Sequence, residues 1–208
     1  MHPLIRRFLM WNFQERTNRV VNILKPHLQG ATLDVGCGNG DVTKHLNHDN
    51  IIGIDVYEPI NPRIEIKLFD GVHIPFETQS FDTVLCTTSL HHVDEPAALI
   101  AEMRRVGKKL VILEDNFDNF IRQQSVLLLH AIAYKILKIP YEAEKFKSRQ
   151  VWEQFFTENG LRIVGCTKHS TIVPLWPFLG HYLFILEPAE ILQSSPSQSE
   201  KSLEAIHR

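Results

Sequence analysis

A glycine-rich stretch at residues 33–40 holds the residues best suited to chemistry in this chain. It reads LDVGCGNG, and the apolar residues before it are typical of a buried strand. Gly36, Gly38 and Gly40 fall at the expected turn from this strand into a helix. Glycine tolerates a positive φ angle and lets a ligand approach the backbone, so the stretch predicts a site for a nucleoside-bearing cofactor. Glycines can also serve a tight chain reversal alone.

The charged residues near the turn indicate which class of cofactor it can bind. A dinucleotide site reads G-x-G-x-x-G, and its third glycine is replaced here by Asp41, next to the place of a pyrophosphate. Asp34 adds a carboxylate just before the first glycine. These negative charges disfavour a pyrophosphate but suit the ammonium and sulfonium groups of S-adenosylmethionine. We therefore expect S-adenosylmethionine, with a nicotinamide-dependent oxidoreductase as the weaker alternative.

Polar residues also follow the next apolar segments. Residues 51–55 end in Asp55, about twenty residues after the glycines, which is the spacing of a ribose-binding acid. Residues 64–69 lead into Asp70 and Gly71, and residues 81–86 lead into the stretch TTSLHHV. A scaffold has no physical need for carboxylates at the ends of several strands, so their presence favours a working binding site.

With these residues in view, the chain resembles the class I S-adenosylmethionine-dependent methyltransferases, particularly the small-molecule branch that includes ubiquinone and menaquinone biosynthesis enzymes. Four motifs carry the resemblance, namely LDVGCGNG at 33–40, IIGIDV at 51–56, FDGVHIPFETQSFDTVLCTTSLHHV at 69–93 and KKLVILED at 108–115. It covers roughly residues 15–187. One departure is the turn at 104–109, which has a single glycine where the family often has Pro-Gly-Gly.

The resemblance implies a fold and a set of cofactor contacts. The fold is an α/β, Rossmann-like, doubly wound sheet of seven strands, with the last strand antiparallel and helices on both faces. Asp34 and the 36–40 loop would lie near the methionine moiety, Asp55 would bind the ribose, and Asp70 would accept from the adenine amino group. The full set of expected cofactor-binding residues is Asp34, Gly36, Cys37, Gly38, Gly40, Asp55, Val56, Asp70, Gly71 and Thr87.

Two adjacent histidines are the candidates for catalysis. Methyl transfer is an in-line displacement that mainly requires alignment of donor and acceptor, and only some acceptors need a base. His91 and His92 follow the fourth strand, where the family commonly lines its acceptor site, and an imidazole can remove a proton near neutral pH. We slightly favour His91. The alternative, in which one histidine is packed and the other solvated, stays open. We assign no metal.

The chain is expected to form one domain at 1–188, followed by a disordered tail at 189–208. Within it, the helical segment at about 116–150 has two explanations. Its apolar residues can be buried against the sheet or a dimer partner, or they can form a lid over the acceptor or a surface that touches a membrane. The expected helices are 14–28, 41–46, 94–106 with Asp94 as N-cap, 118–138 and 148–159, and the expected strands are 31–35, 51–55, 64–69, 81–86, 108–115, 161–168 and 180–186.

The amino-acid composition limits the kinds of binding partner that we expect for this protein. The 208 residues are 44% hydrophobic, and 22 basic against 24 acidic residues give a net charge of -2, which offers no general attraction to nucleic acid. The three cysteines form no C-x-x-C pair, and the N-terminus lacks the features of a secretory signal, so we expect a cytoplasmic protein. The expected partner is a small-molecule acceptor and not a nucleic acid, and peripheral contact with a membrane surface through the apolar helix stays an alternative. A catalytically inactive subunit with this fold is the remaining alternative.

Overall fold

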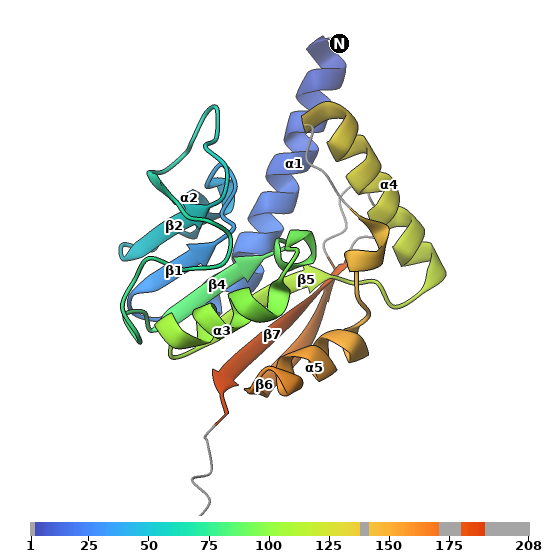
Figure 1. Cartoon of the computed structure of the whole chain (residues 1–208). Helices are drawn as coiled ribbons and strands as arrows, with labels where there is room; N and C mark the ends of the chain where they lie inside the picture. Colours follow the sequence, from blue (N-terminus) through green and yellow to red (C-terminus); the bar gives the residue numbers. More distant parts are fainter. Residues whose placement is uncertain (1–2, 138–141, 171–179, 190–208) are drawn as a thin grey trace, which may run out of the picture.

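The computed structural model describes residues 3–137, 142–170 and 180–189. Within these ranges the centre is a seven-stranded sheet with the order β3-β2-β1-β4-β5-β7-β6 (Figure 1). Neighbouring strands from β3 to β5 are parallel, whereas β7 is antiparallel to both β5 and β6. The predicted fold is thereby confirmed. The strands are β1 Thr32–Val35, β2 Ile51–Asp55, β3 Ile66–Leu68, β4 Thr83–Thr87, β5 Leu110–Asp115, β6 Leu161–Ser170 and β7 Gly180–Pro188.

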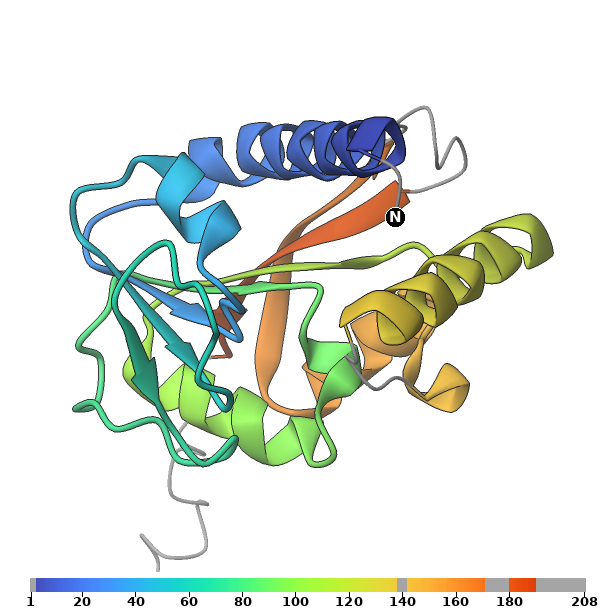
Figure 2. The ribbon, with the colours of Figure 1, turned by 90° about the horizontal axis from the view of Figure 1, so that it is seen from above.

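Helices cover both faces of the sheet. Figure 2 shows α1 (Pro3–Leu24) and the short α2 (Asp41–Leu46) on one face and α3 (Pro96–Val106) on the other. The helix α5 (Arg149–Glu158) lies on the same face as α3 (Figure 1). Short 3-10 turns follow α1 at Lys25–His27, follow β4 at Leu90–His92 (η2), and precede α5 at Ala143–Lys145.

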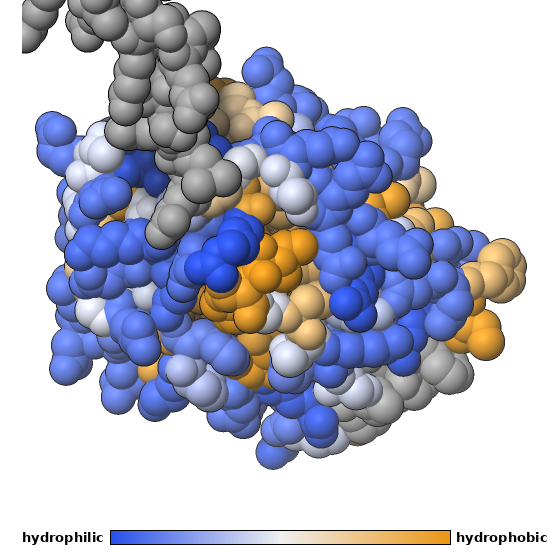
Figure 3. Space-filling model, turned by 90° about the horizontal axis from the view of Figure 1, so that it is seen from below, coloured by the Kyte–Doolittle hydropathy of each residue, from blue (hydrophilic) through white to orange (hydrophobic). Residues whose placement is uncertain are grey.

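The sheet builds two cores because successive side chains of a strand point to opposite faces. In β5, Leu110 and Ile112 join the larger cluster, which also contains side chains of α3 and α5. Val111 and Leu113 join the smaller cluster, beneath α1 and α2. All of β5 is buried, as expected for a central strand covered on both sides. Seen from below, the surface is largely hydrophilic around a hydrophobic patch (Figure 3).

The helix α4 (Phe120–Leu137) lies beyond the carboxyl end of β5 and beside the sheet (Figures 1 and 2). Its described side chains join neither sheet cluster. Val126 and Leu129 instead pack on Phe146, together with Phe13, Phe117 and Leu127, in a small separate cluster, which we call the aromatic cluster. Phe120, Ile121 and Leu128 of α4 are exposed. Burial in the sheet cores, one of the two explanations of this apolar segment, therefore does not account for the described side chains of α4.

Several boundaries differ from the prediction for local reasons. The first helix begins at Pro3 and ends at Leu24, because Pro26 lacks the N–H needed to continue an α-helix and a 3-10 turn follows. Asp94 does not cap α3. Glu95 occupies the N-cap position without a side-chain bond, and Asp94 pairs with Lys145 Nζ at 2.5 Å. The predicted tail from residue 190 onward lies outside the described residues.

The packing of α5 in the larger cluster can be tested with two neighbouring residues, one buried and one exposed. Trp152 is 1% exposed and stacks on Phe156, while its neighbour Val151 is 48% exposed. Trp152→Ala removes a buried aromatic side chain and leaves a cavity, so it should lower the free energy of unfolding by about 3–5 kcal/mol. Val151→Ala should change it by less than about 0.5 kcal/mol. Urea unfolding followed by circular dichroism measures both, and equal effects would show that the helix does not pack as described.

Candidate functional site

The glycine turn after β1 leaves one side of its backbone open. Gly36, Gly38 and Gly40 all have left-handed φ angles, of 72°, 58° and 76°. A Cβ atom added to Gly36 would lie 2.7 Å from Ser89, and one added to Gly40 would lie 2.4 Å from Ile64. At Gly38 an added Cβ would meet no atom within 4 Å. Two glycines therefore permit close packing within the protein, whereas the backbone at Gly38 is accessible to a ligand.

Asp34 is a buried carboxylate with an incomplete set of partners. Asp34 lies in β1, and only 2% of its surface is exposed. Thr43 Oγ1, from α2, donates to Oδ2 at 2.6 Å, while the buried Oδ1 has no hydrogen-bond partner. Burial raises the pKa of Asp34 from its usual 3.8 to about 7. A cationic group placed beside Oδ1 would remove this penalty, because buried charges are stable only when they are paired.

Asp55, at the end of β2, holds the glycine turn in place. Its Oδ2 accepts from the Gly38 N–H at 2.7 Å, and its Oδ1 accepts from the Tyr57 N–H at 3.1 Å. Each carboxylate oxygen keeps a second lone pair that can accept from ribose hydroxyls. The next residue, Val56, is 46% exposed, and a Cβ added to Gly71 would lie 3.2 Å from Val56 Cγ1. The structure thus brings the predicted ribose acid next to a small apolar surface.

Asp70 is bound within its own loop. Its Oδ1 accepts from the N–H groups of Val72 and His73, at 2.8 and 2.6 Å, and its Oδ2 lies 2.7 Å from His73 Nδ1. The hydrogen bond with His73 contributes most to lowering the pKa of Asp70 to about 2. The carboxylate is therefore ionised and exposed. Its expected bond to an adenine amino group would use a remaining lone pair of Oδ2 or replace the His73 contact.

Cys37 and Thr87 lie on opposite sides of the turn. The Cys37 sulfur packs toward β2, since a Cβ added to Gly53 would lie 2.8 Å from it, and burial raises the pKa of the thiol far above neutral pH. Thr87 Oγ1 is buried without a hydrogen-bond partner. Ser89 Oγ lies 2.9 Å from the carbonyl oxygens of both Gly36 and Thr87. Ser89 and Thr43 support the site but were not predicted, because single hydroxyl residues give no pattern in the sequence.

The two candidate histidines lie in η2, and His91 belongs to a buried polar network. His91 is 2% exposed, and its Nδ1 lies 2.5 Å from Oε2 of the buried Glu114. The other oxygen of Glu114 accepts from the Leu90 N–H at 2.9 Å. Burial would lower the pKa of His91, but the charge and hydrogen bond of Glu114 outweigh burial and raise it. Glu114 therefore fixes the orientation of the imidazole and supports its protonated form.

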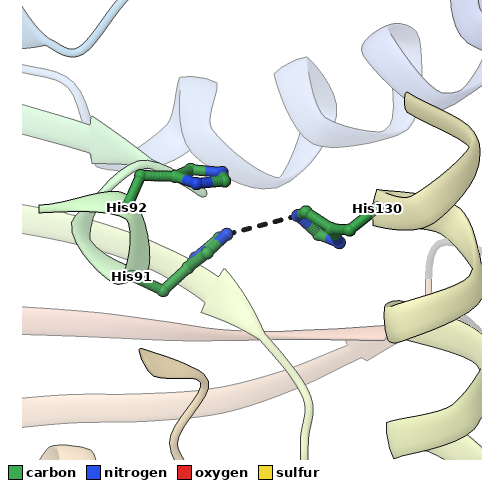
Figure 4. A group of neighbouring side chains, drawn as sticks. All are labelled: His91, His92 and His130. Atoms are coloured by element: carbon green, nitrogen blue, oxygen red, sulfur yellow. Dashed lines mark hydrogen bonds between the residues drawn. The ribbon is translucent and has the colours of Figure 1, made fainter. Parts of the chain in front are cut away.

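A third histidine comes from α4. His130 Nε2 lies 3.3 Å from His91 Nε2, and the half-buried His92 lies beside both (Figure 4). The ring of Phe146 stacks on His91 with 4.5 Å between centroids. Prediction found His91 and His92 but missed His130 and Glu114, which lie far along the chain. Two further histidines, His45 and His48, lie apart from this group and contact the backbone carbonyls of Asp41 and Gly30.

The strand order, the glycine turn and the flanking carboxylates together define a Rossmann-like cofactor-binding domain, and comparisons give its family. A family model described as "Methyltransferase domain" matches residues 33–113. The chain is 31% identical to the demethylmenaquinone methyltransferase of Lactobacillus johnsonii, over 70% of this chain and 73% of that protein. A SAM-dependent methyltransferase from Thermotoga maritima, a possible histamine N-methyltransferase, has a TM-score of 0.64 at 16% identity, covering 89% of this chain and 96% of that one.

A second relative is longer than this chain. The tRNA U34 carboxymethyltransferase of Nautilia profundicola is 33% identical over 77% of this chain and 55% of that protein, so this chain spans about half its length. Taken together, these matches show that the chain belongs to the class I S-adenosylmethionine-dependent methyltransferases. S-adenosylmethionine is the cofactor of that family, and the carboxylates around the turn fit its charges.

Membership of this family excludes the nicotinamide alternative. The negative charge of Asp41, however, disfavours a pyrophosphate less than the sequence indicated. Asp41 was expected to repel a pyrophosphate at the start of α2. In the structure its Oδ1 lies 3.1 Å from Arg63 Nε, so an ion pair compensates part of its charge. The pairing could not be foreseen because Arg63 lies in the long loop between β2 and β3.

The raised pKa of Asp34 predicts how stability depends on pH. Between pH 4 and 7 the folded state keeps a proton that the unfolded chain has already lost, because the pKa is about 7 when folded and 3.8 when unfolded. The free energy of unfolding should therefore fall as pH rises through this window, by at most about 4 kcal/mol. Urea midpoints measured from pH 4.5 to 7.5 should show a flatter profile for Asp34→Asn. The half-exposed Asp41→Asn is the control, and an unchanged slope in Asp34→Asn would contradict the assignment.

Proposed function

We propose that this chain transfers the methyl group of S-adenosylmethionine to a small acceptor bound beside His91 and His92. The observation that carries the proposal is the unpartnered, buried oxygen of Asp34 at a glycine turn whose outer backbone is open. A carboxylate in this state favours a ligand that brings positive charge, and the methionine end of the cofactor brings both an ammonium and a sulfonium. Family membership supports the same donor.

The proposed cofactor runs along the carboxyl ends of β1, β2 and β3. Asp34, with the backbone of the 36–40 loop, would hold the methionine moiety, and Thr87 lies on the β4 side of it. Asp55 would accept from the ribose hydroxyls. Val56 and Gly71 would flank the adenine, with Asp70 near its amino group. These roles are supported by burial, hydrogen bonding and the packing of Gly71 on Val56.

The proposed acceptor is small and apolar or lipid-like. Beside His91, the aromatic cluster presents Phe146 and Phe117, whose rings are stacked with 5.4 Å between centroids. Such side chains bind rings and alkyl groups and offer little to a charged substrate. α4 borders this region through His130, which supports the lid among the explanations of the 116–150 segment. One relative is by name a demethylmenaquinone methyltransferase.

The charges of the described surface favour a small molecule over a nucleic acid, even though one relative acts on tRNA by name. The basic residues at the end of α3 are already engaged. Arg104 donates to the backbone carbonyls of Asn159 and Gly160, Arg105 pairs with Glu102, and Lys108 pairs with Asp82. These side chains therefore stabilise the domain, and they are not a phosphate-binding surface.

A cytoplasmic location with peripheral membrane contact completes the proposal. No helix in the described ranges is long and apolar enough to cross a membrane. Large apolar side chains are nevertheless exposed near the start of α1, at Leu4, Phe8 and Trp11, and on α4, at Phe120 and Ile121. Leu4, Phe8 and Trp11 recur at helical spacing, a pattern that suits transient contact with a lipid surface. All three cysteines are free, as expected in a reducing compartment.

Calorimetric titration of S-adenosylmethionine and its demethylated product tests the cofactor site. Asp55→Ala removes a charged acceptor from the ribose and the support of the Gly38 N–H, so affinity should fall at least about tenfold, equivalent to roughly 1.5–3 kcal/mol. Asp49→Ala, an exposed site after α2, is the matched control and should bind normally. If the native protein bound neither compound, the inactive-subunit alternative would replace the enzyme.

Glu114→Gln tests whether Glu114 positions His91 as the base that removes a proton from the acceptor. The substitution removes the charge that raises the pKa of His91 and disturbs its Nδ1 hydrogen bond. With a quinol or phenol that the native protein methylates, we expect turnover to fall about 100-fold and the acid limb of the rate profile to move to lower pH. Cofactor affinity should not change. Glu144→Gln, at an exposed site, is the control, and an unshifted pH profile in Glu114→Gln would rule out this role.

A further inference from the structure

Three imidazoles from two separate elements converge beside the proposed acceptor position. His91 and His92 come from η2 and His130 comes from α4, and one ring nitrogen of each lies within 4.8 Å of the others. Figure 4 shows His130 directed toward the two adjacent histidines. Imidazole nitrogens are common ligands of first-row transition metals, and three of them with an open position are typical of catalytic zinc sites.

The hydrogen bonds of the Nδ1 atoms of His91 and His130 decide which charges meet between the two rings. His91 Nδ1 faces the Glu114 carboxylate, and His130 Nδ1 lies 3.0 Å from the Val126 carbonyl oxygen. Both oxygens only accept, so both Nδ1 atoms must donate. When both rings are neutral, each Nε2 atom then carries a lone pair and no proton. The Nε2 atoms of His91 and His130 are 3.3 Å apart, so the two lone pairs face each other. This arrangement requires a positive species between them, either one additional proton or a metal ion.

The geometry fits a metal ion. With zinc–nitrogen bonds of 2.0–2.1 Å and tetrahedral angles, two ligating nitrogens lie about 3.3 Å apart. The Nε2 atoms of His91 and His130 have this separation. His92 is half-buried and its ring centroid is 5.6 Å from that of His130 and 4.2 Å from that of His91. One ring nitrogen of His92 lies within 4.8 Å of one nitrogen of each of the other two rings, so a side-chain rotation of His92 would complete a three-nitrogen set.

The surrounding charges also favour a cation. Glu114 bonds the outer nitrogen of His91, which is the carboxylate–histidine arrangement that orients metal ligands and increases their basicity. Asp115 Oδ2 lies 4.0 Å from His130 Nε2, with its other oxygen 3.1 Å from His181 Nε2. Arg16 is the opposing charge, since it lowers the pKa values of both His91 and His130. Lys147 also interacts electrostatically with Glu114, so positive side chains offset part of the negative charge around the imidazoles.

We propose that His91, His92 and His130 bind one divalent transition-metal ion of the zinc class, which fastens α4 to the sheet edge and leaves one position for an acceptor oxygen. The catalytic part of this inference rests on the proposed function. The metal would lower the pKa of a bound hydroxyl, whose proton leaves to water. The resulting oxyanion forms a bond to the methyl carbon, and the carbon–sulfur electron pair stays on sulfur. His91 then acts on the hydroxyl through the metal that it binds, and Glu114 keeps its role of positioning His91.

Metal titration of the tag-free protein, stripped with a chelator, tests the site without any methyl-transfer assay. Zn²⁺ in competition with a chromophoric chelator should bind once per chain, and His130→Ala should weaken binding more than about 100-fold, since loss of an outer-shell partner alone costs 10–100-fold. His130→Gln guards against loss of folding, with circular dichroism as the check. His45→Ala, on α2, should leave affinity unchanged. Co²⁺ should give the visible spectrum of a tetrahedral nitrogen site without a thiolate charge-transfer band.

The possible results separate the metal from the cofactor. If Zn²⁺ fails to bind once per chain, or His130→Ala and His130→Gln bind it as the native protein does, the proposal is wrong and the two imidazoles share a proton instead. S-adenosylmethionine titrated into the same samples reports on the proposed function independently. Normal cofactor binding with no metal binding would overturn only the metal site, whereas metal binding without cofactor binding would overturn only the donor assignment.

Discussion

Burial of negative charge at one edge of the sheet is the constraint on which the rest of this structure depends. Asp34, Asp55, Glu114 and Asp115 lie at or near the carboxyl ends of β1, β2 and β5, and each is at most 8% exposed. A buried carboxylate is stable only with compensation, and each has a different kind. Asp34 is stabilised by the Thr43 hydroxyl and a raised pKa, Asp55 by backbone N–H groups, and Glu114 and Asp115 by histidines. The edge therefore attracts cations.

This constraint divides the site into two halves with different chemistry. On the β1–β2 side the compensation is incomplete, because Asp34 keeps an unpartnered oxygen, and the proposed cofactor would bring the positive charge that the protein does not supply there. On the β5 side the protein supplies imidazoles of its own, with the pKa of His91 raised by Glu114. β4 lies between β1 and β5 in the sheet, and the Ser89 hydroxyl, just beyond its end, contacts the Gly36 carbonyl. The two halves are thus linked by one short segment that carries both the turn contact and His91.

The sequence predicted the β1–β2 half much better than the β5 half. Asp34 and Asp55 each follow a short apolar strand at a fixed distance from the glycines, so local pattern was sufficient, and the family resemblance supplied the antiparallel β7. Glu114 was inside a quoted motif, yet only the three-dimensional pairing with His91 gives it a role. His130 sits in an apolar helix with no local signal of function. Asp94 does not cap α3 because the helix begins one residue later, with Glu95 at the N-cap position, and the Asp94 side chain pairs with Lys145, far along the chain.

The described part of α4 is held to the protein less extensively than the glycine turn. The cofactor turn is fixed to a sheet whose strands are buried on both faces, so it cannot shift without disturbing both cores. The described side chains of α4 contact the protein through the aromatic cluster and through His130 and His91, and they include the exposed Phe120, Ile121 and Leu128. Segments with few buried contacts open at lower free energy than the core. The structure therefore combines a glycine turn that is fixed between two cores with a helix that has a smaller buried contact of its own, and the imidazole cluster is the point where the two meet.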